Sequence, residues 1–128
     1  MTHTLIIKGQ LPCANDFIKA CNSHRQVGAK LKRETERIIA AYIWAQLKGV
    51  RIDNPVMMHY SWYEPNKKRD KSNIAFAKKF LEDSLISCGV LKGDGWRYVH
   101  GFTDFFTVDK VNPRVEVVIR EVILCKQS

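Results

Sequence analysis

The sequence lacks the features of a zinc protein, a secreted protein and a membrane protein. Its four histidines are scattered, and its opening run, MTHTLIIKGQLP, has too short an apolar segment for a signal peptide or a membrane span. The cysteines contain no CxxC pair, which argues against structural zinc; they are Cys13, Cys21, Cys88 and Cys125. We therefore expect a cytoplasmic protein with reduced thiols and no contact with a membrane.

Acidic residues are scarce relative to basic ones. The chain has 13 Asp and Glu residues against 21 Lys and Arg residues, which gives a net charge of +8 and a pI near 9.5. Such a cation excess suits a polyanionic partner, because neutralising phosphates releases condensed counterions. Basic solvated faces also occur in proteins that bind no nucleic acid. The charge alone therefore leaves both interpretations open.

The length and composition indicate one globular domain. A chain of 128 residues is long enough to bury an ordinary core, and 45% hydrophobic with 27% charged residues is typical of a folded protein. No internal repeat or low-complexity segment is present. We predict a single domain over residues 1–128 that folds by itself or as an oligomer.

Apolar periodicity and turn residues predict an α+β fold, with a small mixed β-sheet that is covered on one face by two main helices. Ser72 or Asn73 is the expected N-cap of the second main helix. The predicted elements are, in order, a strand within HTLIIKGQL, a short helix over 16–21, a helix over about 29–48, a strand over 56–62, a helix from 72 or 73 to 88, a strand within VLKGDGWRYVHGF and a strand within RVEVVIREV.

Both main helices should bury an apolar stripe. In the first helix the predicted core residues are Ile38, Ala41, Tyr42 and Ala45. In the second they are Ile74, Ala77, Leu81, Leu85 and Cys88. Gly49 and Gly89 are expected to end the two helices. Trp96 and Tyr98 are expected to pack the following turn against the sheet, with base stacking as the alternative.

The segment KKRDKSNIAFAKK, residues 67–79, places an acid among cations just before the second main helix. This acid is Asp70, and Asp94 follows the helix in a glycine-rich turn. The helix rises about 1.5 Å per residue, so the two acids can meet within one subunit only if the 89–95 loop folds back beside it, or else across an oligomer. Two acids facing a phosphate would suit Mg²⁺. Alternatively, Asp70 is a solvated charge paired with Arg69, and Asp94 is a turn former.

The loop cations before the helix are candidates for phosphate contacts. Four of the five residues 67–71 are basic, which concentrates positive charge beside Asp70. These four cations are Lys67, Lys68, Arg69 and Lys71. A solvated loop with no ligand is the alternative interpretation.

The run RDKSNIAFAKKFLEDSL, followed by GVLKGDGW, resembles the RusA-type Holliday junction resolvases. Members of that family are small prophage-associated endonucleases with an Asp-x-Asp-Asn motif ahead of a helix and a further Asp in the loop after it. The opening LPCANDFIKACNSHRQVGAKLKR is also similar to the beginning of phage members. The resemblance assigns Asp70 to the first acid, Asn73 to the motif asparagine and Asp94 to the acid after the helix.

The resemblance leaves two positions to assign, the catalytic lysine and the second motif acid. The family's catalytic lysine is expected about one turn before a helix aspartate; Lys79 precedes Asp83 by four residues, so Lys79 matches better than Lys78. Ser72 stands where the second motif acid is expected. A hydroxyl ligates a metal only weakly or through water, so this replacement should lower the affinity for Mg²⁺ and is able to abolish turnover.

The resemblance implies a homodimeric, Mg²⁺-dependent endonuclease, with Mn²⁺ as a substitute, that resolves four-way DNA junctions in phage recombination or repair. It implies Asp70, Ser72 and Asp94 as metal ligands and Asp70, Lys79 and Asp94 as catalytic residues. The implied DNA contacts are Lys67, Lys68, Arg69, Lys71 and Asn73. One alternative is a catalytically impaired junction-binding protein, because of Ser72. Another is a general RNA- or single-strand-binding module that uses Trp96 and Tyr98.

Overall fold

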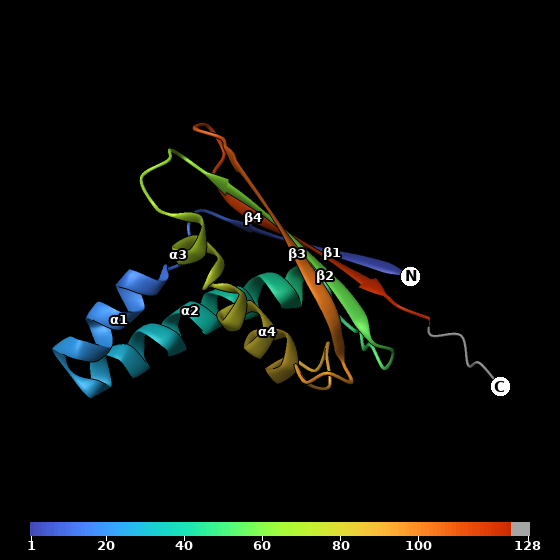
Figure 1. The fold of residues 1–128 in the computed structure, drawn as a ribbon. Coiled ribbons are helices and arrows are strands. Elements are labelled where there is room, and N and C mark those ends of the chain that lie inside the picture. The colour runs from blue at the N-terminus through green and yellow to red at the C-terminus, as the bar shows by residue number, and fades with distance from the viewer. Residues whose placement is uncertain (124–128) are drawn as a thin grey trace.

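The structure is a computed structural model that describes residues 1–123. It is an α+β domain in which helices cover one face of a sheet, as predicted (Figure 1). The elements are β1 (Thr2–Lys8), α1 (Ala14–Ser23), α2 (Arg25–Gln46), β2 (Val56–Glu64), α3 (Lys71–Ala75), α4 (Lys78–Ser87), β3 (Val99–Val108) and β4 (Arg114–Glu121).

The sheet is mixed and has four strands in the order β1-β4-β2-β3. β4 pairs antiparallel with both β1 and β2, whereas β2 and β3 are parallel. A parallel pair needs a crossover connection, and α3 and α4 provide it here. The strand order places β3 at one edge of the sheet. The loop after β2, which carries most of the predicted site, lies beside it.

The core lies between the sheet and the helices. Every second residue of β2 from Val56 to Glu64 is buried, and Leu5, Ile7, Val115, Val117 and Ile119 supply the same face from β1 and β4. Within this core the Tyr60 and Trp62 rings stack with centroids 5.6 Å apart, and Phe106 of β3 continues the row 6.4 Å from Trp62. The aromatic row therefore reaches the edge strand.

The buried face of α2 differs from the prediction. Thr35, Ile39 and Ile43 are buried, while Ile38 is 56% exposed and Ala41 and Ala45 are also exposed; Tyr42 is only half-buried. The helix is thus rotated by about one residue, or about 100°. Ile39, Ile43 and Leu47 recur at a spacing of four residues, so the sequence also offers this buried stripe. At Gly28 the two helices approach closely, because an added Cβ would lie 2.4 Å from Sγ of Cys21 in α1.

The second main helix is interrupted. Instead of one helix to Cys88, α3 ends at Ala75 and α4 begins at Lys78, with Phe76 and Ala77 between them. Phe76 packs against Phe17 and Phe80 with ring centroids 5.7 Å apart in both pairs, and this contact with α1 accompanies the interruption. The predicted core residues of this segment are confirmed. Ile74, Ala77, Leu81 and Leu85 are buried, and Cys88 packs against the core.

The N-cap of α3 is Asp70, so the prediction of Ser72 or Asn73 is wrong by at least two residues. The backbone N–H of Ile74 donates to the carbonyl of Asp70 at 3.0 Å, and the first turn that this bond closes already contains Ser72 and Asn73. After α4, Gly89 adopts a positive φ of 80°, as expected for a helix-ending glycine. The two predicted helix ends at Gly49 and Gly89 are both confirmed, since Gly49 has a φ of 77° and follows α2.

The third strand follows the glycine-rich turn, as predicted, and extends beyond the predicted run to Val108. Residues around Gly95 form a turn in which the N–H groups of Tyr98 and Val99 donate to its carbonyl, and β3 then runs to Val108. Trp96 lies in this turn and is 99% exposed, so the expectation that it packs against the sheet is wrong. Asp109 shapes the turn between β3 and β4, because its carboxylate accepts two backbone N–H bonds there.

The described cysteines, Cys13, Cys21 and Cys88, are free thiols, and Cys125 lies outside the described residues. Each helix within residues 1–123 is too short or too polar to span a bilayer.

The rotation of α2 predicts very different losses of stability for two adjacent isoleucines. Ile39→Ala should lower the free energy of unfolding by about 2–5 kcal/mol, because it leaves a cavity in the core. Ile38→Ala should change it by less than about 0.5 kcal/mol, because this side chain is exposed. Urea denaturation of both variants measures the difference. Equal destabilisation, or a larger loss for Ile38→Ala, would contradict the rotation.

Candidate functional site

A buried ion pair organises the loop that carries the predicted DNA-binding residues. Glu64, at the end of β2, is 6% exposed and accepts two bonds from the Arg69 guanidinium, each at 3.0 Å. Gln10 donates to Glu64 at 3.0 Å, and Arg69 donates to the carbonyl of Leu11 at 2.9 Å. A bidentate pair of this kind is rigid, so it closes the loop over 65–68 and fixes where the chain enters α3.

This pairing changes the interpretation of Arg69. Its guanidinium pairs with Glu64 and not with Asp70. Oδ2 of Asp16 lies 4.0 Å from Nη1 of Arg69. The alternative interpretation of Asp70 as the partner of Arg69 is therefore wrong. Arg69 supports the loop from inside, and the loop offers its remaining cations to solvent.

Those remaining cations are Lys67, Lys68 and Lys71. All three are exposed, and within the described part of the chain none forms an ion pair with a carboxylate. Lys71 instead lies over the Phe106 ring, with Nζ 5.8 Å from the centroid. Asn73, the remaining residue predicted to contact DNA, is half-buried in α3. The lysines are the groups that phosphates can reach.

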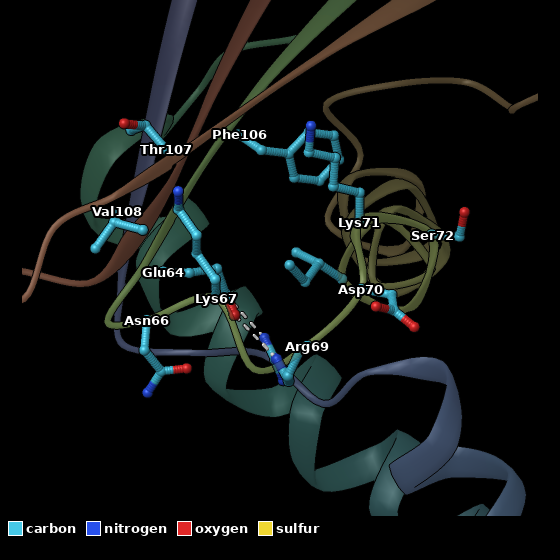
Figure 2. Close-up of a pocket in the computed structure, with 11 residues that line it drawn as sticks. Glu64, Asn66, Lys67, Arg69, Asp70, Lys71, Ser72, Phe106, Thr107 and Val108 are labelled. Carbon is cyan, nitrogen blue, oxygen red and sulfur yellow. Dashed lines mark hydrogen bonds and ion pairs between the residues drawn. The ribbon is translucent and has the colours of Figure 1, made fainter.

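An open hollow of about 810 Å³ lies between this loop and β3, and we call it the β3 hollow. Figure 2 shows the Glu64–Arg69 pair on one side of it and the Phe106 and Lys71 side chains next to each other on the opposite side. Its lining includes Glu64, Asn66, Lys67, Arg69, Lys71 and Phe106.

Asp70 and Ser72 lie where the β3 hollow meets α3. The Asp70 side chain makes no capping hydrogen bond, and in Figure 2 its carboxylate points away from the Phe106 ring. Ser72 is exposed and also lines a second, smaller hollow of about 450 Å³ with Lys78 and Asp104. Both side chains are therefore accessible to a ligand.

Asp94 contacts Lys79. The loop after α4 folds back beside the helix, so that Nζ of Lys79 lies 2.5 Å from Oδ2 of Asp94 and 3.1 Å from Oδ1 of Asp83. The hydrogen bond from Lys79 lowers the pKa of Asp94 below its ordinary value. The bonds to Asp94 and Asp83 raise the pKa of Lys79 in turn. The predicted lysine and post-helical acid are thus brought together.

The predicted metal ligands fall into two places. Asp70 and Ser72 lie at the start of α3, whereas Asp94 is held by Lys79 beside α4. Across residues 1–123, no three side chains of the His, Cys, Asp and Glu types form a group able to hold a metal ion. Asp70 fits a metal as a free carboxylate. Asp94 fits one less well, because Lys79 already neutralises it.

Sequence reasoning missed a second lysine–acid pair. Nζ of Lys78 lies 2.5 Å from Asp104 of β3 and 3.7 Å from the centroid of Phe102, and Trp62 donates to the same carboxylate at 2.8 Å. Consecutive residues of a helix point about 100° apart, so Lys78 faces β3 while Lys79 faces the 89–95 loop. The available signal was the single acid within the aromatic strand FTDFF.

Glu82 lies between the two pairs and was also missed. The Tyr60 hydroxyl donates to its carboxylate at 3.4 Å. Burial, followed by the nearby Asp94 charge, raises the pKa of Glu82 above its ordinary value. Its position three residues after Lys79 and four after Lys78 places it on the same side of α4 as both lysines. The helix therefore presents a row of alternating charges to β3 and the loop.

Comparison with known proteins gives no further assignment, since neither a protein-family model nor a curated protein matches the sequence.

Replacing Arg69 should destabilise the fold. Arg69→Met leaves the buried Glu64 carboxylate without its cation, and we expect a loss of about 3 kcal/mol in the free energy of unfolding. Lys67→Met, in the same loop, is the matched control and should change it by less than about 0.5 kcal/mol. Guanidinium denaturation measures both. Equal stability of the two variants would show that the pair does not hold the loop.

The Lys79–Asp94 contact predicts a shifted carboxyl titration. Because the folded-state pKa of Asp94 lies below its ordinary value of 3.8, the pair stabilises the fold above that pH, and the contribution is lost as the pH falls through the folded-state pKa. Lys79→Gln should raise the pKa of Asp94, measured by carbon NMR of the carboxyl group. Lys78→Gln, which breaks the pair with Asp104, should leave it unchanged. An unaltered Asp94 titration in Lys79→Gln would contradict the contact.

Proposed function

We propose that this protein is a RusA-type, Mg²⁺-dependent endonuclease that binds and nicks branched DNA. The observation that carries the proposal is the 2.5 Å contact between Lys79 and Asp94. The two residues are fifteen positions apart in the sequence, and the family resemblance assigns both to catalysis. Their contact in one subunit supports a shared role.

Binding would be electrostatic. The chain carries a net charge of +8, and the exposed lysines of the loop remain available to phosphates. Lys67 and Lys71 line the β3 hollow, and Asp70 and Ser72 line it as well. Phosphates bound at the lysines would therefore lie beside the candidate metal ligands.

Asp70 is the residue that would hold Mg²⁺, with Ser72 assisting directly or through water. Mg²⁺ typically takes one or two protein carboxylates together with substrate phosphates and water, so a complete protein cage is not required. When bound, it would supply a Lewis acid for phosphodiester hydrolysis. Lys79 does not line the β3 hollow. It would offset negative charge on a phosphate that reaches α4, and Asp94 would hold the Lys79 ammonium in position.

The proposed substrate is a four-way junction, and the proposed active form is a homodimer in the cytoplasm of a phage-infected or prophage-bearing cell. Two sites per dimer suit paired nicks in opposed strands. These parts of the proposal come from the family resemblance.

A second candidate is a junction-binding protein that has lost cleavage. One observation favours it: Ser72 stands where the motif has a second carboxylate. Incubating a labelled mobile junction with the protein, with and without Mg²⁺ or Mn²⁺, and resolving both binding and nicking separates the two candidates. Metal-dependent nicking supports the first, and binding without nicking supports the second.

Junction binding should weaken steeply with salt. We expect a log–log slope of about −0.9 per phosphate neutralised on duplex arms. Neutralising Lys67, Lys68 and Lys71 to Gln together should weaken junction and duplex binding alike and make the slope shallower by about two to three units. Lys48→Gln is the control, because Lys48 is exposed in the turn after α2 and does not line the β3 hollow. A flat salt response of the parent protein would reject electrostatic binding.

Restoring the missing acid should improve the metal site. Ser72→Asp should raise the affinity for Mn²⁺, measured by electron paramagnetic resonance, and increase Mg²⁺-dependent nicking. Ser72→Asn, of the same size without the charge, should do neither. Asp70→Asn should remove nicking while junction binding remains. Unchanged metal affinity and cleavage in a folded Ser72→Asp variant would overturn the assignment of Asp70 and Ser72 as ligands, as would full activity of Asp70→Asn.

A further inference from the structure

The β3 hollow is lined by the aromatic ring of Phe106 and by the cations Lys67 and Lys71. Phe106 is stacked against Trp62 at 6.4 Å, with 15° between the ring planes. β3 is an edge strand, so within residues 1–123 no neighbouring strand covers the other side of this ring. The Lys71 side chain lies there, with Nζ 5.8 Å from the ring centroid. The row of rings that begins at Tyr60 thus ends in an open space.

The charges around the hollow favour an anion. Glu64 and Arg69 neutralise each other through two hydrogen bonds. Lys67 and Lys71 then outnumber the single remaining carboxylate, that of Asp70. A phosphate can be held at these lysines, which stand on the rim of the space that Phe106 borders.

The polar groups of the hollow suit the edge of a nucleobase. The side-chain oxygen Oδ1 of Asn66 accepts the backbone N–H of Lys68 at 3.0 Å. The NH₂ group of the same side chain therefore stays available as a donor. A volume of about 810 Å³ is sufficient for one nucleotide, since small-molecule sites are typically of about 300–1,000 Å³.

We propose that the β3 hollow binds one unstacked nucleotide of the DNA, with its base against Phe106 and its phosphate at Lys67 and Lys71. The inference rests on the proposed function and names what the protein would recognise at a branch point. Bases inside a linear duplex are stacked and cannot enter the hollow. Bases at a branch point can leave the stack at a lower cost, and stacking on an aromatic side chain then offsets that cost.

The test is photocrosslinking with 5-iodouracil placed at the branch point of a four-way junction, in a single strand and within a linear duplex. We expect a crosslink to Phe106, mapped by mass spectrometry, with the junction and the single strand, and none with the duplex. A junction crosslink that maps outside residues 64–72 and 106–108 would overturn the proposal. This arm uses the unaltered protein and so does not depend on how any variant folds.

Affinity measurements provide the second arm. Phe106→Leu keeps an apolar side chain beside Trp62 but removes the ring, and junction affinity should fall about tenfold while duplex affinity stays within about twofold. Phe105→Leu is the control, because Phe105 is the adjacent residue and is 60% exposed. Equal effects of the two variants, or equal losses on junction and duplex, would overturn the proposal.

The outcomes separate this inference from the proposed function. If the parent protein nicks junctions but Phe106→Leu binds them normally and no crosslink forms at Phe106, the hollow proposal fails and the proposed function stands. If the parent shows no preference for junctions over duplex, the proposed function fails. The crosslink with the single strand then tests by itself whether the β3 hollow binds a nucleotide, because it requires an unstacked base but no branch point.

Discussion

The buried pair of Glu64 and Arg69 is the interaction on which the candidate site depends. Its two hydrogen bonds tie the end of β2 to the residue before Asp70, and the bond from Arg69 to Leu11 ties both to the segment after β1. Burying the Glu64 carboxylate alone would cost several kcal/mol. The loop therefore keeps this arrangement only while Arg69 is present to pair with Glu64. The exposed lysines, Asp70 and the opening of the β3 hollow are all positioned by this internal contact.

Much of the fold could be predicted from the sequence because its strands alternate clearly and its turns have strong signals. The α+β class, the strands around 56–62 and 114–121 and the core residues of α4 follow from periodicity. The buried face of α2 was predictable, since Ile39, Ile43 and Leu47 recur every four residues, but the prediction chose the neighbouring stripe. The interruption at Phe76 could not be predicted, because it accompanies a contact with Phe17 of α1 that is distant in the sequence.

The residues of the candidate site come from the family resemblance, and their arrangement could not be predicted. The resemblance picks out Lys79 and Asp94, and the structure brings them into contact. It also groups Arg69 with the DNA-binding cations, whereas the buried Glu64 engages that guanidinium. The sequence places Lys78 and Lys79 side by side, yet α4 directs one toward Asp104 of β3 and the other toward the 89–95 loop. Only tertiary structure separates the roles of two adjacent lysines.

The position of β4 in the sheet has a consequence for folding. β4 is the final strand in sequence, yet it lies between β1 and β2, and its register pairs Thr2 with Arg120. Contacts between residues so distant in the chain give a high contact order, which slows folding because loop closure precedes the stabilising contacts. During synthesis, β1 and β2 remain without their shared neighbour until residues 114–121 have emerged from the ribosome. The nascent chain therefore exposes two unpaired strand edges.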